Sequence, residues 1–194
     1  MINWSSYNFH PVVFLPSKYS VLDLSGDNVN VKPETDFWIG RYNEIRKNLY
    51  SAELFEGIRN IHVGIDIGAP VGTPCMSFSD GVIKFFGYNP QIGDYGNVII
   101  TEHEFDSIYL WALYGHLDSK SIQFKKIGQP ISRGEVIGHM GNQYENGGWP
   151  SHLHFQLSFI EPATHDLPGV VSADEHFQSL QDFPDPRLVL GALY

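Results

Sequence analysis

Residues 152–157 read His-Leu-His-Phe-Gln-Leu, and this alternation of polar and apolar side chains is typical of a β-strand. Successive side chains of a strand point to opposite faces of its sheet. Leu153, Phe155 and Leu157 therefore face a core, while His152 and His154 share the other face. The two histidines lie about 6–7 Å apart along such a strand. We predict a strand that is anchored by one face and presents two imidazoles on the other.

Similar short runs recur through the middle of the chain, at residues 81–86, 97–100 and 107–114. Each is rich in β-branched or aromatic residues or alternates in polarity, and turns rich in Gly, Pro, Asn and Asp separate them. This regular succession of short strands predicts an all-β domain, built as an antiparallel sheet that forms a sandwich or barrel.

The two ends of the chain differ from this middle part. We predict an N-terminal extension over residues 1–60, a core over 61–160 and an acidic, proline-containing tail over 161–194 that packs on the core. One or two helical turns are expected in the tail around 174–180. One helix is expected in the extension, with Thr35 or Asp36 as N-cap. Its evidence is apolar residues at mixed three- and four-residue spacing: Phe37, Ile39, Tyr42, Ile45 and Leu49.

Composition excludes several classes of function. Of 194 residues, 42% are hydrophobic and 18% charged, and the formal charge is −10, which disfavours nucleic acid or an anionic membrane as the main partner. A single cysteine, Cys75, allows neither an intrachain disulfide nor a multi-cysteine zinc site. No apolar run approaches the roughly 18 residues of a membrane span. The first residues show no secretory signal, so a cytoplasmic protein is expected, with an exported mature form left open.

Three short motifs carry candidate chemistry. In His62-Val63-Gly64-Ile65-Asp66, the histidine and the aspartate share parity, but extended chain would separate them by roughly 13 Å. Both can reach one metal ion, at about 2 Å each, only if the chain bends between them. Gly64 stands where a bend or bulge costs least. The other two motifs are Tyr114-Gly115-His116-Leu117 and the His152-Leu153-His154 pair.

Each motif alone also fits ordinary structural residues. Two same-face histidines on a strand occur by chance, and His62 with Asp66 could be a surface histidine and a turn aspartate. A lone histidine at a strand end, such as His116, is more often structural than catalytic. The combination is much more specific, because nitrogen and oxygen ligands of this kind suit a zinc ion that keeps one position open.

Taken in order, the three motifs resemble the signature of the lysostaphin-type (LytM-type) zinc metallopeptidases: H-x3-D, a His in a Tyr/Gly-His-Leu context, and H-x-H. The glycine-rich segments between the motifs, at residues 72–83, 93–100, 134–138 and 141–142, look like the family as well. The resemblance covers about residues 61–159. It implies a β-sheet groove, similar to a duplicated hybrid motif, with the active site on the groove floor.

By motif position, the resemblance assigns Zn²⁺ to His62, Asp66 and His154, and leaves His116 and His152 as catalytic histidines that do not bind the metal. Zinc held by three protein ligands lowers the pKa of a bound water towards about 7. His152 would then take or orient the water proton, and His116 would help to stabilise the oxyanion of the amide under attack. The division of labour between the two histidines stays open at this point.

The substrate is less well defined than the chemistry. A peptidoglycan-type endopeptidase is what the family implies. The acidic balance does not favour adsorption to an anionic cell wall. The segments 145–151, 168–170 and 184–186 resemble a subgroup found fused to kinase-like and aminotransferase-like domains. That subgroup suggests a zinc amidase or peptidase for small intracellular peptides or amino-acid conjugates. A non-enzymatic binding domain is the third possibility, although no expected zinc ligand is missing. The oligomeric state is undetermined, and we expect the extension or tail to cover the site in part.

Overall fold

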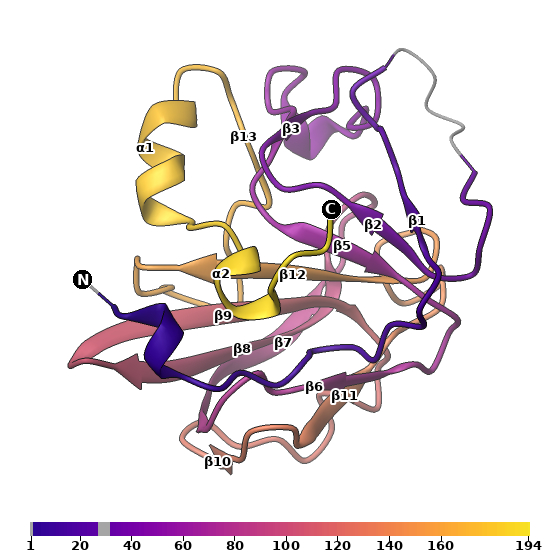
Figure 1. Ribbon diagram of the computed structural model, residues 1–194. Coiled ribbons are helices and arrows are strands. Elements are labelled where there is room, and N and C mark those ends of the chain that lie inside the picture. Colours follow the sequence, from indigo (N-terminus) through magenta and orange to yellow (C-terminus); the bar gives the residue numbers. More distant parts are fainter. Residues whose placement is uncertain (1, 27–31) are drawn as a thin grey trace.

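The computed structural model describes residues 2–26 and 32–194, and Figure 1 shows its elements. In chain order these are η1 (Trp4–Ser6), β1 (Ser20–Val21), β2 (Trp38–Gly40), β3 (Glu44–Ile45), η2 (Glu53–Phe55), β4 (Ile61–His62), β5 (Ile65–Gly68), β6 (Pro74–Met76), β7 (Gly81–Asn89), β8 (Gly96–Phe105), β9 (Ile108–Leu117), β10 (Pro130–Ile131), β11 (Val136–His139), β12 (His152–Ser158), β13 (Val170–Val171), α1 (His176–Asp182) and α2 (Arg187–Leu190).

The predicted all-β class is confirmed. Within the described residues, eight strands form one sheet in the order β1-β2-β5-β12-β9-β8-β7-β10, and its neighbours are antiparallel except for the β1–β2 pair. β11 pairs with β6, and β13-β4-β3 form a small third sheet. In Figure 1, β3 and α1 lie above the long strands of the main sheet, whereas β6, β11 and the edge strand β10 lie below them.

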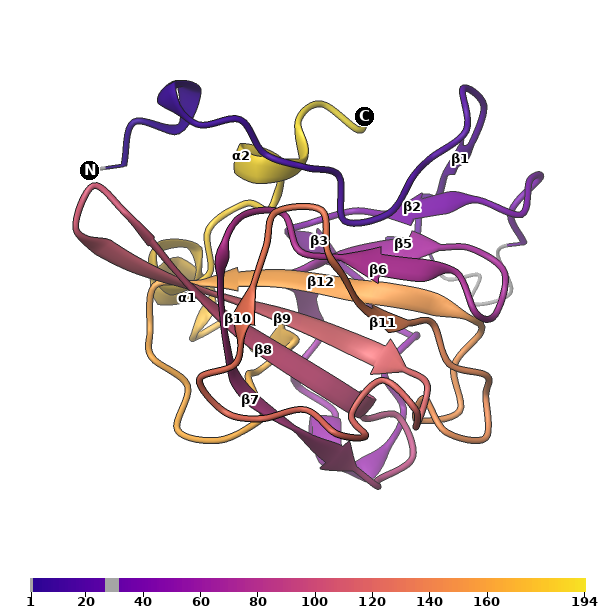
Figure 2. The ribbon, with the colours of Figure 1, turned by 90° about the horizontal axis from the view of Figure 1, so that it is seen from below.

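Both faces of the main sheet are covered. Below it, Leu153 and Phe155 of β12 belong to the larger apolar cluster, together with Val12 and Val13 of the N-terminal segment. The view from below shows β11 and its connections in front of the long strands (Figure 2). Above the sheet, a second cluster joins strand residues to apolar side chains of the tail, such as Leu167. Strand β12 therefore has one apolar anchoring face, as its alternation predicts.

The predicted N-terminal helix is wrong. Residues 38–40 form β2, which pairs with β5, and residues 44–45 form β3, which pairs with β4. The spacing of the apolar residues at 37, 39, 42 and 45 is compatible with a helix and with short strands. Pairing with β4 and β5 satisfies the backbone hydrogen bonds of this segment and overrides the weak helical pattern. The helical elements found in this region are two single turns, η1 and η2.

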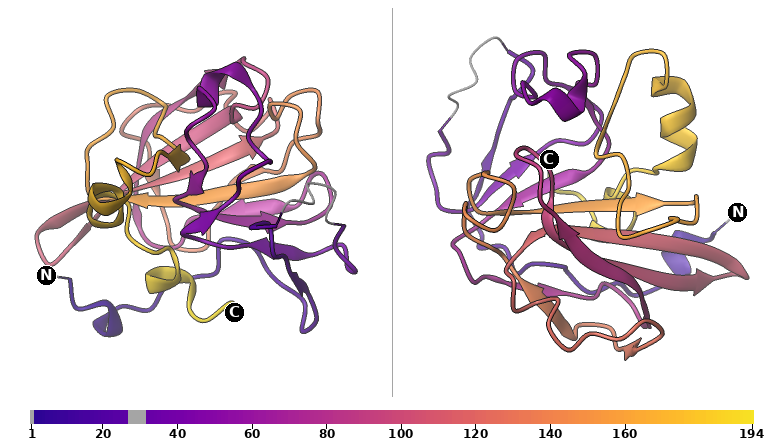
Figure 3. Two further views of the ribbon diagram at one scale, coloured as in Figure 1. Left: turned by 90° about the horizontal axis from the view of Figure 1, so that it is seen from above. Right: turned by 180° about the vertical axis from the view of Figure 1, so that it is seen from behind.

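A helix is present where the sequence predicts helical turns in the tail. The helix α1, at His176–Asp182, overlaps the predicted turns around 174–180. Strands of the extension and the tail nevertheless pair directly with those of the predicted core, since β3 and β13 flank β4. Seen from above, the segment that carries β3 and η2 crosses over the main sheet (Figure 3). Among the described residues, no helix is long and apolar enough to cross a membrane.

Candidate metal centre

His62 and Asp66 come together because the chain changes sheet between them. β4, which ends at His62, pairs with β3 and β13, whereas β5, which begins at Ile65, pairs with β2 and β12. The bend required by the sequence is this change of sheet at residues 63–64. In β12, His154 is the register partner of Asp66, so the third side chain lies directly opposite the second.

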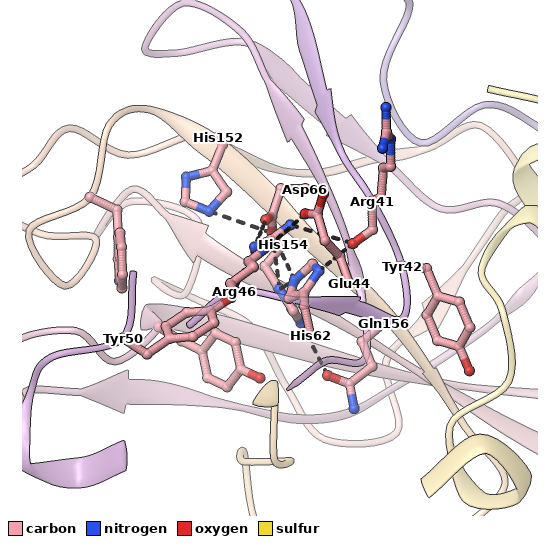
Figure 4. Close-up of polar contacts among 12 residues, drawn as sticks. Arg41, Tyr42, Glu44, Arg46, Tyr50, His62, Asp66, His152, His154 and Gln156 are labelled. Atoms are coloured by element: carbon pink, nitrogen blue, oxygen red, sulfur yellow. Dashed lines mark hydrogen bonds and ion pairs between the residues drawn. The ribbon is translucent and has the colours of Figure 1, made fainter. Parts of the chain in front are cut away.

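The three side chains of the first and last motifs bring their ligand atoms together in a small triangle (Figure 4). His62 Nε2 lies 3.1 Å from His154 Nδ1 and 3.2 Å from Asp66 Oδ1. The third side, from His154 Nδ1 to Asp66 Oδ1, is 3.1 Å. Tetrahedral ligands at the usual zinc distances of about 2.0–2.1 Å lie roughly 3.3 Å apart, so the triangle has the size that zinc requires.

Neighbouring groups determine which nitrogen of each ligand histidine faces the triangle. His62 donates its Nδ1–H to the carbonyl oxygen of Arg41 at 2.8 Å, which leaves the Nε2 lone pair free. His154 Nε2 faces Gln156 Oε1 at 3.0 Å, and the amide nitrogen of Gln156 donates to the carbonyl of Pro168. The amide oxygen of Gln156 therefore accepts from His154 Nε2–H, and Nδ1 is the free nitrogen. Such partners orient metal ligands and fix their tautomers.

The electrostatics favour an unprotonated His62 and an ionised Asp66 at neutral pH. Burial, together with the charge of Arg46, lowers the pKa of His62 to about 4. Burial raises the pKa of Asp66, but the neighbouring His62 and Arg46 outweigh it and hold that pKa well below its usual range. Two imidazole lone pairs and one carboxylate oxygen thus point at one another in a buried space. A divalent cation removes the repulsion, so the donor set fits zinc.

His152 and His116 lie beside the triangle. His152 donates Nδ1–H to the carbonyl of Pro150 at 2.7 Å, and its Nε2 lies 3.7 Å from Asp66 Oδ1. His116 donates Nδ1–H to the carbonyl of Asn146 at 2.8 Å. The two rings are in contact, with centroids 4.3 Å apart. Burial lowers the pKa of both side chains, so both present neutral Nε2 atoms at pH 7.

A bulge orients His116. The pairing of β8 with β9 shifts register between Asn97↔Leu117 and Ile99↔Tyr114, which leaves one extra residue in β9. His116 adopts φ 65°, in the left-handed region that residues with side chains seldom occupy. Bulges are common beside active sites, where they re-aim a side chain. The sequence suggested that His116 ends its strand, but it lies within β9 at this bulge.

The histidines open into a cavity of about 290 Å³. Its walls include Trp149, which is half-buried and donates its indole N–H to the carbonyl of Gly93. Much of the remaining lining comes from the extension: Leu22, Leu24, Trp38, Leu49, Tyr50, Leu54 and Phe55. The extension therefore covers part of the site.

Cys75 and His139, two residues outside the three motifs, lie away from the ligand triangle. Cys75 is fully buried in the larger apolar cluster, as expected of a core residue. His139 is exposed in β11 and does not join the site.

Sequence reasoning missed Gln156 and Arg46. Gln156 could have been found, because it stands two residues after His154 and so shares its face. Arg46 gave no such signal, since it meets Asp66 across 20 residues of chain.

Comparison with known proteins agrees with the geometry. The sequence model of peptidase family M23 matches residues 60–165, more than half of the chain. The chain belongs to peptidase family M23. The resemblance drawn from the three motifs is thereby confirmed. All of the candidate site residues from His62 to His154 lie inside the matched range, whereas Arg41, Glu44 and Arg46 lie outside it.

This M23 chain is similar to parts of larger proteins, and two relatives give the size of the matched part. It is 36% identical over 112 residues to the DD-carboxypeptidase/endopeptidase Mpg of Neisseria meningitidis serogroup B, which covers 56% of this chain and 23% of that protein. It is 36% identical over 96 residues to the peptidoglycan DD-endopeptidase ShyA of Vibrio cholerae, covering 50% and 20%. The chain thus spans less than a quarter of the length of these curated relatives.

Solved structures of similar proteins include a zinc-containing peptidase from Vibrio cholerae, which is 30% identical with a TM-score of 0.41 over 50% of this chain and 27% of that one. They also include a mutant catalytic domain of the prophage-encoded M23 protein EnpA from Enterococcus faecalis. That domain is 23% identical, with a TM-score of 0.47 over 71% of this chain and 89% of that one.

Proposed function

We propose that this M23 chain is a zinc-dependent metallopeptidase that hydrolyses amide bonds, with Zn²⁺ held by His62, Asp66 and His154. The observation that carries the proposal is the triangle of three ligand atoms, with sides of 3.1–3.2 Å. Zinc in such a site lowers the pKa of a bound water towards about 7 and polarises a carbonyl oxygen. Peptidoglycan-type endopeptidase activity is the expectation that the family gives.

In the proposed mechanism, His152 is the general base. Its Nε2 is unprotonated, is held in place by the Nδ1 hydrogen bond to Pro150, and lies 3.7 Å from Asp66 Oδ1, beside the ligand triangle. It is therefore placed to take a proton from the attacking water. His116 contacts the His152 ring, and we assign it to the substrate side, where its Nε2 would donate to the developing oxyanion once it has taken up a proton released in the reaction.

The proposed activity is tested by metal analysis and chelation. The purified chain is expected to hold about one zinc ion, and an excess of a chelator should abolish amide hydrolysis that added zinc restores. A chain that binds no zinc, or whose hydrolysis survives chelation, would overturn the proposal. In that case the third possibility, a binding domain without activity, would be favoured.

A second candidate is a peptidase or amidase for small substrates, and the cavity favours it. At about 290 Å³ the cavity lies at the lower end of the roughly 300–1,000 Å³ typical of small-molecule sites. The ligand residues are only 1–4% exposed, beneath side chains of the extension. A short peptide fits such a space, whereas a peptide attached to a glycan strand would require the extension to move.

The charged residues of the cavity suit the ends of a short peptide. Asp94 and Asp166 line the cavity, and so does Arg59, whose buried Nε finds no hydrogen-bond partner among the described residues. An amino terminus and a carboxylate would each meet an opposite charge. We therefore propose short peptides with free ends as substrates. A cytoplasmic location would agree with such substrates and is tested by cell fractionation.

A substrate panel separates the two candidates. It compares muropeptides and intact peptidoglycan with short dipeptides and acyl amino acids, each with and without a chelator. Preference for the dipeptides, lost when their ends are acetylated or amidated, supports the second candidate. Chelator-sensitive release of fragments from peptidoglycan, with no cleavage of short peptides, supports endopeptidase activity on the cell wall instead.

A further inference from the structure

The carboxylate of Asp66 is divided between two partners. Its Oδ1 belongs to the ligand triangle, whereas Oδ2 accepts a hydrogen bond from Arg46 Nη1 at 2.7 Å. The guanidinium therefore restrains rotation of the carboxylate and leaves a single oxygen to face the metal. Resting on the zinc site proposed above, we infer that Arg46 is a positioning residue, which holds Asp66 as a one-oxygen zinc ligand.

Arg46 is itself held on several sides. It is 1% exposed, which is unusual for an arginine. Nε donates to Glu44 Oε2 at 2.9 Å, and Nη1 also donates to the Tyr50 hydroxyl at 2.9 Å. Glu44 is fixed in turn, since its Oε1 accepts from the backbone N–H of Leu24. Figure 4 shows Arg46 and Glu44 beside the ligand triangle.

The backbone leaves room for this contact at one glycine. Gly40 of β2 is the register partner of Asp66 in β5. A Cβ atom at position 40 would lie 2.8 Å from Arg46 Nη2 and 2.9 Å from Asp66 Oδ2. Any side chain there would displace the ion pair. The structure thus supports the Arg46–Asp66 contact from an independent position in the chain.

The charges explain why a cation is needed beside Asp66. Asp66 and Glu44 place two carboxylates in a space that excludes water, and Arg46 neutralises only one of them. A buried charge without a partner is costly, so the remaining negative charge favours a cation at the ligand triangle. Without Arg46, Asp66 could turn both oxygens towards the metal or rotate away from it, and the geometry for a bound water would be lost.

The same contacts give the extension a role in the site. Arg46 orients one ligand, and the carbonyl of Arg41 fixes the tautomer of another, His62. Both residues precede the range matched by the family model, 60–165. The segment 41–46 therefore completes the partners that surround the zinc ligands, in addition to covering the cavity.

The test measures zinc affinity directly, by competition with a chromophoric chelator, and so does not depend on substrate. Arg46→Met is expected to weaken zinc binding by about 10–100-fold, the range typical for loss of a residue that orients a metal ligand. Arg46→Lys, which keeps the charge but not the planar fork, should fall between Arg46→Met and the unchanged protein. Arg187→Met is the matched control, because that arginine pairs with Asp185 and touches no zinc ligand.

The outcomes separate this inference from the proposed function. If the unchanged protein binds no zinc, both fail. If it binds zinc and a folded Arg46→Met variant binds equally well, only the role of Arg46 is overturned. Should Arg46→Met not fold, Gly40→Ala replaces it as the test, and a folded Gly40→Ala protein with unchanged zinc affinity overturns the inference. Circular dichroism establishes folding, and a change in the kcat pH profile of Arg46→Lys would further support positioning.

Discussion

Gly64 lies against the imidazole ring of His154 so closely that a Cβ atom at position 64 would stand 2.5 Å from His154 Cε1 and 2.6 Å from Nε2. The same atom would lie 3.0 Å from the carbonyl oxygen of Phe155. The chain does leave one sheet for another at this point, as the spacing of His62 and Asp66 requires. The residue is glycine, however, because the ring of His154, the third proposed zinc ligand, occupies the space beside it.

Gly64→Ala is therefore expected to displace His154 and to weaken zinc binding. The ring cannot give way easily, because Gln156 accepts its Nε2–H on one side and Asp66 Oδ1 lies 3.1 Å from its Nδ1 on the other. Gly128→Ala is the control: it has a positive φ of 77° and nothing within 4 Å, so it adds about 1–2 kcal/mol of backbone strain and no clash. Zinc affinity and thermal unfolding of both variants check the prediction, and equal zinc affinity in the two would contradict it.

The ligand and non-ligand histidines should separate by metal content. His154→Ala removes a vertex of the triangle and is expected to lose most of the zinc. His116→Ala should retain zinc and lose turnover by about 10²–10³-fold, the range for loss of one donor to the oxyanion. Metal analysis beside kinetics on the same samples makes the comparison. If His116→Ala also loses its zinc, the assignment of His116 as a non-ligand is wrong.

Gln156 gives a prediction about tautomers. Gln156→Leu leaves His154 Nε2–H and the Pro168 carbonyl without their partners, at a cost of about 1–3 kcal/mol for each buried group. Zinc affinity should fall by about 10–100-fold. Gln156→Glu keeps an acceptor for His154 and should bind zinc more tightly than Gln156→Leu. Gln178→Leu, on the exposed face of α1, is the surface control.

How far the sequence predicts this structure depends on the range of the contacts. The alternation in residues 152–157 is local, and it correctly gives a strand with two histidines on one face. The bend at Gly64 follows from the reach of two ligands separated by four residues. The segment 37–49 was predicted wrongly as a helix. The spacing of its apolar residues suits a helix as well as strands, and pairing with β4 and β5 selects the strands. Arg46 was not found, because its contact with Asp66 depends on that pairing.

His103 makes the fold sensitive to acid at a point away from the zinc ligands. Its Nδ1–H donates to the carbonyl of Asp80 at 2.8 Å, and its Nε2 accepts from the Thr101 hydroxyl at 2.7 Å. Burial lowers the pKa of His103 from 6.5 to about 4. The unfolded chain therefore binds a proton here between pH 6.5 and 4, whereas the folded chain does not.

The stability that neutral His103 contributes is complete above pH 6.5 and is lost as the pH falls to about 4. At about 1.36 kcal/mol for each pH unit, the 2.5-unit difference amounts to at most about 3 kcal/mol. His103→Gln cannot titrate, so its free energy of unfolding should fall less steeply over this window. Denaturant unfolding at several pH values, with zinc removed by a chelator from both proteins, isolates this contribution. Parallel curves for the two proteins would show that His103 binds its proton equally in the folded and unfolded states.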